Sequence, residues 1–170
     1  MSEVDAELNS YKIVFSPKVI QKINEWNKIA DVRWLTAWNE NARKHLAPAL
    51  KLDDFPVGRT DEQSKVEAAI KTAKEVGPDG LVIWIDDDLK KWKEKNEAGV
   101  KDVGGRGHKE SLDELAMIYD RPNTVLLSPL CGLTDEHLKF MDDVLQNPEL
   151  TKGKCVTNLE PGDRKNCVVM

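Results

Sequence analysis

The sequence has 170 residues, which is enough for one domain with its own hydrophobic core. Hydrophobic residues make up 40% of it and charged residues 32%, which is ordinary for a globular domain in water. The net charge is −5, which argues against a broad nucleic-acid-binding surface because such surfaces gather lysine and arginine. Binding of one phosphorylated nucleotide end is compatible with this charge.

The cysteines and the N-terminus bear on where the protein is found. There are three cysteines and no CxxC pair, so we expect neither a disulfide framework nor a zinc site. No apolar run approaches the length of a membrane span, and the N-terminus carries no secretory signal. These features predict a cytoplasmic protein and leave its oligomeric state open.

Helical and extended patterns alternate along the chain. Short apolar runs predict strands at 32–35, 81–85 and 124–127, and a further short run lies at 13–15. Helices are predicted at 17–30, 38–46, from within 60–67 to 76, 90–95, 112–119 and 134–145. Apolar residues at helical spacing support 17–30, the helix ending at 76 and 134–145, whereas 90–95 is predicted as a solvated helix. Such alternation is typical of a three-layer, doubly wound α/β fold with a mostly parallel sheet.

The remaining segments are predicted to be irregular. Residues 99–108 are polar and contain four glycines, so we expect a loop there. From residue 147 the apolar periodicity disappears. The sequence therefore predicts one domain over 1–146 and a flexible tail over 147–170.

Ligands of doubly wound sheets bind at the carboxyl ends of the strands. Asp86, Asp87 and Asp88 directly follow the most apolar strand. Adjacent, partly desolvated carboxylates repel one another, and a hard cation such as Mg²⁺ relieves that repulsion. The alternative is a solvated turn in which Asp88 caps the next helix.

Two other residues could hold an anion. Thr36 ends the strand at 32–35, where a hydroxyl and free helix N–H groups can bind phosphate. Lys65 lies in the first turn of its helix, where a cation opposes the macrodipole unless an anion is near. The alternatives are a capping threonine and an ordinary surface lysine.

Thr36, Lys65 and Asp86 follow one another as the second, third and fourth motifs of the haloacid dehalogenase superfamily do. Several short sequence stretches resemble one subgroup of this superfamily, the phosphatase-like domain of multi-part RNA-repair proteins. The similar stretches are VRWLTAWN at 32–39, LAPAL at 46–50, FPV at 55–57, VIWIDDD at 82–88, and GLT at 132–134 before His137 and Leu138. The resemblance covers roughly residues 13–145.

This resemblance implies a Mg²⁺-dependent phosphatase that forms an aspartyl-phosphate. Thr36 and Lys65 would hold the phosphate, and Asp86 and Asp87 would hold Mg²⁺. The implied substrate is a small phosphate monoester or a nucleic-acid end. Phosphoryl transfer of this kind depends on positioning and charge neutralisation.

The first motif departs from the family pattern. The nearest match is EVDAELN at 3–9, which puts Asp5 at the general-acid position and Glu3 at the nucleophile position. Glutamate is one methylene longer than aspartate, which displaces the attacking oxygen. Only Met1 and Ser2 precede it, so the first strand is incomplete. Two hypotheses follow: an N-terminally shortened enzyme, or a catalytically silent binding or regulatory module.

The C-terminus carries a separate signal. Cys167 and the three residues after it fit the prenylation pattern, and the final Met170 suits farnesylation. The alternative is a chance match. If Cys167 is prenylated, we expect reversible association with membranes, because a single prenyl chain anchors weakly.

Overall fold

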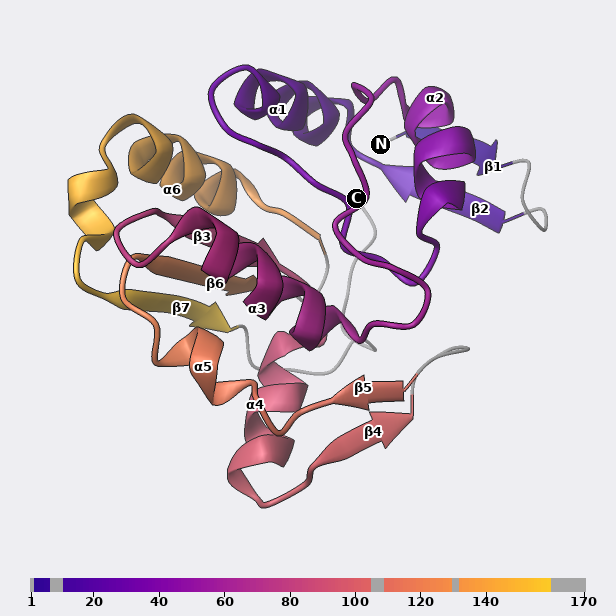
Figure 1. Ribbon diagram of the computed structural model, residues 1–170. Helices are drawn as coiled ribbons and strands as arrows, with labels where there is room; N and C mark the ends of the chain where they lie inside the picture. The colour runs from indigo at the N-terminus through magenta and orange to yellow at the C-terminus, as the bar shows by residue number, and fades with distance from the viewer. Residues whose placement is uncertain (1, 7–10, 105–108, 130–131, 160–170) are drawn as a thin grey trace.

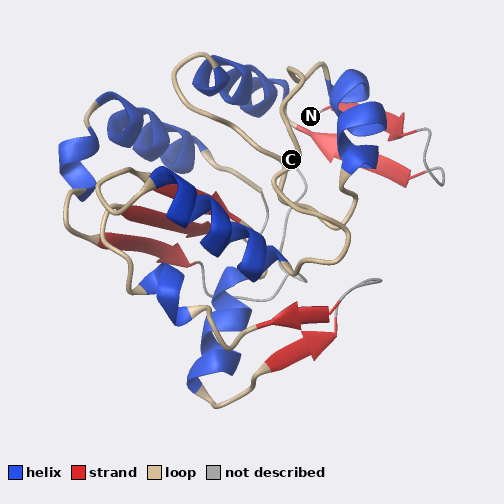
Figure 2. Cartoon of the chain, viewed as in Figure 1, coloured by secondary structure: helices blue, strands red, loops and turns tan. Residues whose placement is uncertain are grey.

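A parallel three-stranded sheet forms the core of the fold (Figure 1, Figure 2). The structure is a computed structural model that describes residues 2–6, 11–104, 109–129 and 132–159. The strands of this sheet, in order across it, are β3 (Val82–Ile85), β6 (Thr124–Ser128) and β7 (Cys155–Leu159). Both strand pairs are parallel, as the alternation of helices and strands predicts.

Helices cover both faces of the sheet. One face packs against α3 (Lys65–Val76), α4 (Leu89–Glu97) and α5 (Ala116–Tyr119). The other face packs against α1 (Pro17–Asn27) and α6 (Asp135–Gln146). The predicted three-layer α/β arrangement is thus confirmed in this coarse form.

Burial explains the two predicted strands with continuous apolar runs. β6, the central strand, is buried along its whole length, and β3, at an edge of the sheet, buries Val82 and Trp84. Trp84 of β3 points into the cluster beneath α3 and α4, and Val125 and Leu127 of β6 point into the cluster beneath α6. A strand with two buried faces needs a continuous apolar run rather than an alternating one. The runs at 81–85 and 124–127 therefore predicted these strands correctly.

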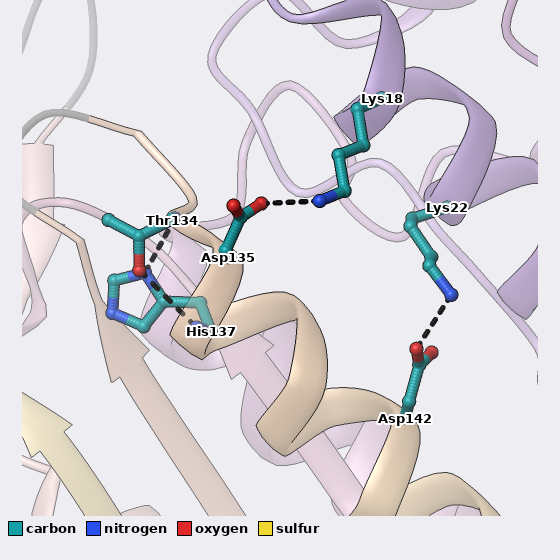
Figure 3. Close-up of polar contacts among 6 residues, drawn as sticks. All are labelled: Lys18, Lys22, Thr134, Asp135, His137 and Asp142. Carbon is teal, nitrogen blue, oxygen red and sulfur yellow. Dashed lines mark hydrogen bonds and ion pairs between the residues drawn. The ribbon is translucent and has the colours of Figure 1, made fainter.

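Ion pairs fix α1 beside α6 (Figure 3). Lys18 and Lys22 of α1 point towards Asp135 and Asp142 of α6, with N–O distances of 2.7 and 2.6 Å. The indole Nε1 of Trp26 also donates to Asp142, at 2.8 Å. The Lys22 and Trp26 contacts hold the pKa of Asp142 below its ordinary value.

The predicted tail is wrong in its first part. A 3₁₀ turn, η2 (Pro148–Thr151), leads into β7, which pairs with β6 in parallel from Thr124↔Cys155 onward. β7 lies at the edge of the sheet, and its sequence mixes polar with apolar residues. An edge strand needs no continuous apolar run, which is why the loss of periodicity misled the prediction.

Two short segments also differ from expectation. Within the expected loop at 99–108, β4 (Asp102–Gly104) pairs antiparallel with β5 (Lys109–Ser111). The strand expected at 32–35 is reduced to one parallel bridge, Trp34↔Val57.

The N-terminal region forms a separate hairpin. β1 (Ser2–Ala6) and β2 (Tyr11–Phe15) make a two-stranded antiparallel sheet, with α2 (Ala47–Leu50) beside it (Figure 1). Before α2 the chain makes a π-helical turn, η1 (Ala42–Leu46), in place of the helix expected at 38–46.

Candidate functional site

The centre of the candidate site is an ion pair between Lys65 and Asp86. Lys65 Nζ lies 2.9 Å from Asp86 Oδ2, and the two side chains are 14% and 4% exposed. Asp86 follows β3 directly, and its N–H continues the ladder by donating to the carbonyl of Leu127. Lys65 is the first residue of α3, and its Nζ also lies 5.5 Å from the ring centre of Trp92. The structure thus brings together two of the predicted site residues.

The acidic triplet forms a tight turn after β3. Carboxylate oxygens of Asp86, Asp87 and Asp88 all lie within 4.8 Å of one another. The second oxygen of Asp86 accepts the N–H of Asp88 at 3.0 Å. Ser128, at the end of β6, donates its hydroxyl to the carbonyl of Asp87 and accepts the N–H of Lys90. The turn is therefore held in place by the neighbouring strand.

The start of α3 is fixed by two carboxylates. Ser64 and Glu67 form a capping box, which is one of two such patterns within the helix start expected at 60–67. Glu110 of β5 is 1% exposed and accepts the N–H of Val66 at 2.7 Å. This carboxylate satisfies a helix N–H group that has no partner within its helix. The contact keeps Lys65 in position to reach Asp86.

Thr36 reaches the same region through a chain of polar contacts. Its carbonyl accepts the N–H of Asn39 at 3.2 Å, and its hydroxyl accepts the N–H of Trp38 at 3.3 Å. The side chain of Asn39 accepts from Arg59 at 3.1 Å. Arg59 in turn donates to the carbonyl of Gln63, two residues before Lys65.

Arg59, Glu110 and Ser128 are site residues that the sequence interpretation missed. Arg59 and Glu110 are buried by contacts between distant segments, which no local pattern encodes. Ser128 could have been found, because it follows the strand at 124–127 at the sheet edge where ligands bind.

The structure does not add the predicted first motif to this site. Glu3 and Asp5 lie on β1, where they pair with Val14 and Lys12 of β2. This hairpin is a different sheet from the one that ends at Asp86. The roles that the resemblance implies for Glu3 and Asp5 stay predictions, and the incomplete first strand expected there lies in a hairpin of its own.

Comparisons with known proteins give no relative. A scan against protein-family models, a search of curated proteins and a search of solved structures each found no match. No helix in the described part of the chain is both long and apolar enough to cross a membrane. Cys167 lies outside the described residues, so its predicted lipidation stays a prediction.

Proposed function

We propose that this chain is a phosphatase-like domain that binds a phosphate group with the help of Mg²⁺ but lacks a positioned nucleophile. The observation that carries the proposal is the buried Lys65–Asp86 pair at the carboxyl end of a parallel strand. A buried charge pair is costly to maintain and is weak evidence for stability alone. Paired charges at the carboxyl end of such a strand are candidates for a binding site.

The donors at this site suit a hard cation. Mg²⁺ prefers oxygen ligands, and Asp86, Asp87 and Asp88 offer only carboxylate oxygens. Mg²⁺ held there would supply the positive charge that Asp86 receives from Lys65 in this structure. Lys65 would then be free to bind a phosphate oxygen together with Thr36. Cation and phosphate should therefore bind cooperatively.

β1, which carries Glu3 and Asp5, belongs to a different sheet from the strand that ends at Asp86. This favours the hypothesis of a catalytically silent binding module over that of an active enzyme. The resemblance to the haloacid dehalogenase superfamily supplies the expectation of a phosphate ligand, on a small monoester or a nucleic-acid end. A fold-level likeness does not establish an activity. The proposal accordingly assigns phosphate binding to Thr36 and Lys65, metal binding to Asp86 and Asp87, and no catalytic step to Glu3 or Asp5.

Calorimetry of inorganic phosphate with and without Mg²⁺ tests the proposal. We expect Mg²⁺ to tighten phosphate binding at least fivefold, because a typical coupling is 1–3 kcal/mol. The double variant Lys65→Met, Asp86→Asn removes both members of the buried pair, so neither charge is left alone. We expect it to bind phosphate at least tenfold more weakly, with or without Mg²⁺.

Lys71→Met is the matched control, because Lys71 is an exposed lysine on the same helix. Its phosphate affinity should equal that of the unchanged chain. Equal phosphate affinity in the double variant, or no effect of Mg²⁺ in the unchanged chain, would refute the proposed function.

We also propose a cytoplasmic location with reversible membrane association through Cys167. The support is the C-terminal sequence alone. Co-expression with a farnesyltransferase, followed by intact-mass measurement of the chain and its Cys167→Ser variant, distinguishes a prenylation signal from a chance match.

A further inference from the structure

Arg59 is a buried cation that the phosphate and metal site does not use. Its exposure is 6%, although arginine is among the residues least often buried without a charged partner. In the described part of the chain it forms no ion pair. The unbonded nitrogen Nη2 is not one of the fully buried atoms without a partner, so this part of the guanidinium is open to solvent and to an approaching anion.

The hydrogen bonds of Arg59 use only part of its guanidinium group. Nε donates to the carbonyl of Gln63 at 2.5 Å, and Nη1 donates to the side-chain oxygen of Asn39 at 3.1 Å. Both acceptors are neutral. A guanidinium has five N–H donors, so three find no acceptor among the described residues. The carboxylate of Asp61 accepts from Asn39 instead of from Arg59.

The backbone places Arg59 beside the phosphate-binding residue Thr36. Trp34 and Val57 form a parallel bridge, and Trp34 exchanges backbone hydrogen bonds with Pro56 and Gly58. Two residues further along each segment come Thr36 and Arg59. Because the two segments run parallel, Thr36 and Arg59 both lie just beyond the Trp34–Val57 bridge, on the same side of it.

Arg59 is also tied to the helix that carries Lys65. Its bond to Gln63 ends one residue before the N-cap, Ser64. Its other bond reaches Asn39, whose N–H is bonded to the carbonyl of Thr36. Arg59 therefore bridges the Thr36 turn and the start of α3.

We infer that Arg59 binds a second anionic group of the ligand, and that the ligand carries two neighbouring phosphates. The inference rests on the proposed function, in which Thr36 and Lys65 hold the first phosphate. The planar fork of a guanidinium matches two oxygens of one phosphate, which an ammonium group cannot do. The shared chemistry is that of a nucleoside diphosphate or of a nucleic-acid end with its adjacent phosphodiester.

The test compares inorganic phosphate with inorganic pyrophosphate, both at saturating Mg²⁺, by calorimetry. Arg59→Lys keeps the charge and removes the fork. We expect it to weaken pyrophosphate binding about tenfold, from loss of a charge-assisted hydrogen bond, and phosphate binding less than twofold. Arg43→Lys is the control, because Arg43 is exposed and already pairs with Asp54; it should change neither affinity.

A second measurement uses the unchanged chain and does not depend on how the variant folds. The Nε–H signal of Arg59 in nitrogen-15 NMR should shift on addition of pyrophosphate and stay in place with phosphate. Equal weakening of both anions by Arg59→Lys, or an Nε–H signal that ignores pyrophosphate, overturns the inference. Phosphate binding that depends on Lys65 but not on Arg59 would leave the proposed function intact, whereas binding of neither anion would defeat both.

Adenosine diphosphate and a 5′-phosphorylated dinucleotide then separate the two sources of paired phosphates. The ligand that binds the unchanged chain more tightly, and whose higher affinity is lost in Arg59→Lys, identifies the source of the paired phosphates. If Arg59→Lys weakens the binding of neither ligand, Arg59 does not bind a second phosphate and the inference is wrong.

Discussion

Asp86 is a buried carboxylate on whose ion pair the proposed site depends. Its two oxygens are engaged by Lys65 and by the N–H of Asp88, so the carboxylate is almost fully compensated inside the protein. Loss of Lys65 alone would leave a buried anion without its cation, which is the costly case for a buried pair. The stability of the site therefore depends on the pair and not on either residue.

A double-mutant cycle on Lys65 and Asp86 measures this dependence. We expect Lys65→Met or Asp86→Asn alone to lower the free energy of unfolding by about 3 kcal/mol. The double variant should lose clearly less than the sum of the two, with a coupling of about 2 kcal/mol. Urea unfolding provides the four values.

The pair Lys93 and Glu97 gives the control cycle. It is an i,i+4 pair on α4 whose side chains are 30% and 53% exposed, so its coupling should stay below about 1 kcal/mol. A coupling for Lys65 and Asp86 that is no larger than this would show that their contact is an ordinary surface ion pair.

At the scale of elements, the contact between α1 and α6 depends on pH. The pKa of Asp142 is lowered first by its hydrogen bond with Lys22 and then by that with Trp26. A lowered folded-state pKa means that the stabilisation is complete above the unfolded-state value of about 3.9 and is lost as pH falls below it.

Asp142→Asn should therefore lower the melting temperature at pH 6 and have progressively less effect as pH falls below about 4. Melting curves at several pH values check this. Asp143→Asn is the control, because its partner Lys139 is 79% exposed and the pair is solvated. A difference between the unchanged chain and Asp142→Asn that is constant over this pH range would contradict the linkage.

Helices and strands that are specified by nearby residues could be predicted from the sequence, whereas features that depend on contacts between distant segments could not. The apolar run before Asp86 identified its strand, and the capping-box patterns at Thr60 and Ser64 located the start of α3 within 60–67, because each depends only on nearby residues. β7 escaped prediction because an edge strand pairs through its backbone and needs only one partner strand. Arg59 escaped for a related reason, since its burial depends on segments that meet only in the folded chain.

At the scale of the whole molecule, the residues of the proposed binding site and those of the first motif lie on different sheets. Lys65 and Asp86, two of the residues predicted to bind phosphate and metal, meet at the end of β3 in the parallel sheet. Glu3 and Asp5 lie on a hairpin that packs with α2 (Figure 1). A nucleophile must approach the phosphorus atom to within about 3.5 Å with correct alignment. The proposed function therefore predicts phosphate binding without phosphoryl transfer.

Hydrolysis of an aryl phosphate tests this separation. We expect Mg²⁺-dependent turnover of the unchanged chain to equal that of Asp86→Asn purified in parallel, which controls for contaminating phosphatases. Glu3→Asp restores the shorter side chain of the family pattern, but it should not raise the rate, because β1 belongs to another sheet. Asp5→Asn should have no effect for the same reason. Robust turnover that Asp5→Asn abolishes and Glu3→Gln preserves would instead identify Asp5 as the nucleophile, and would show that the N-terminal segment joins the site when substrate is bound.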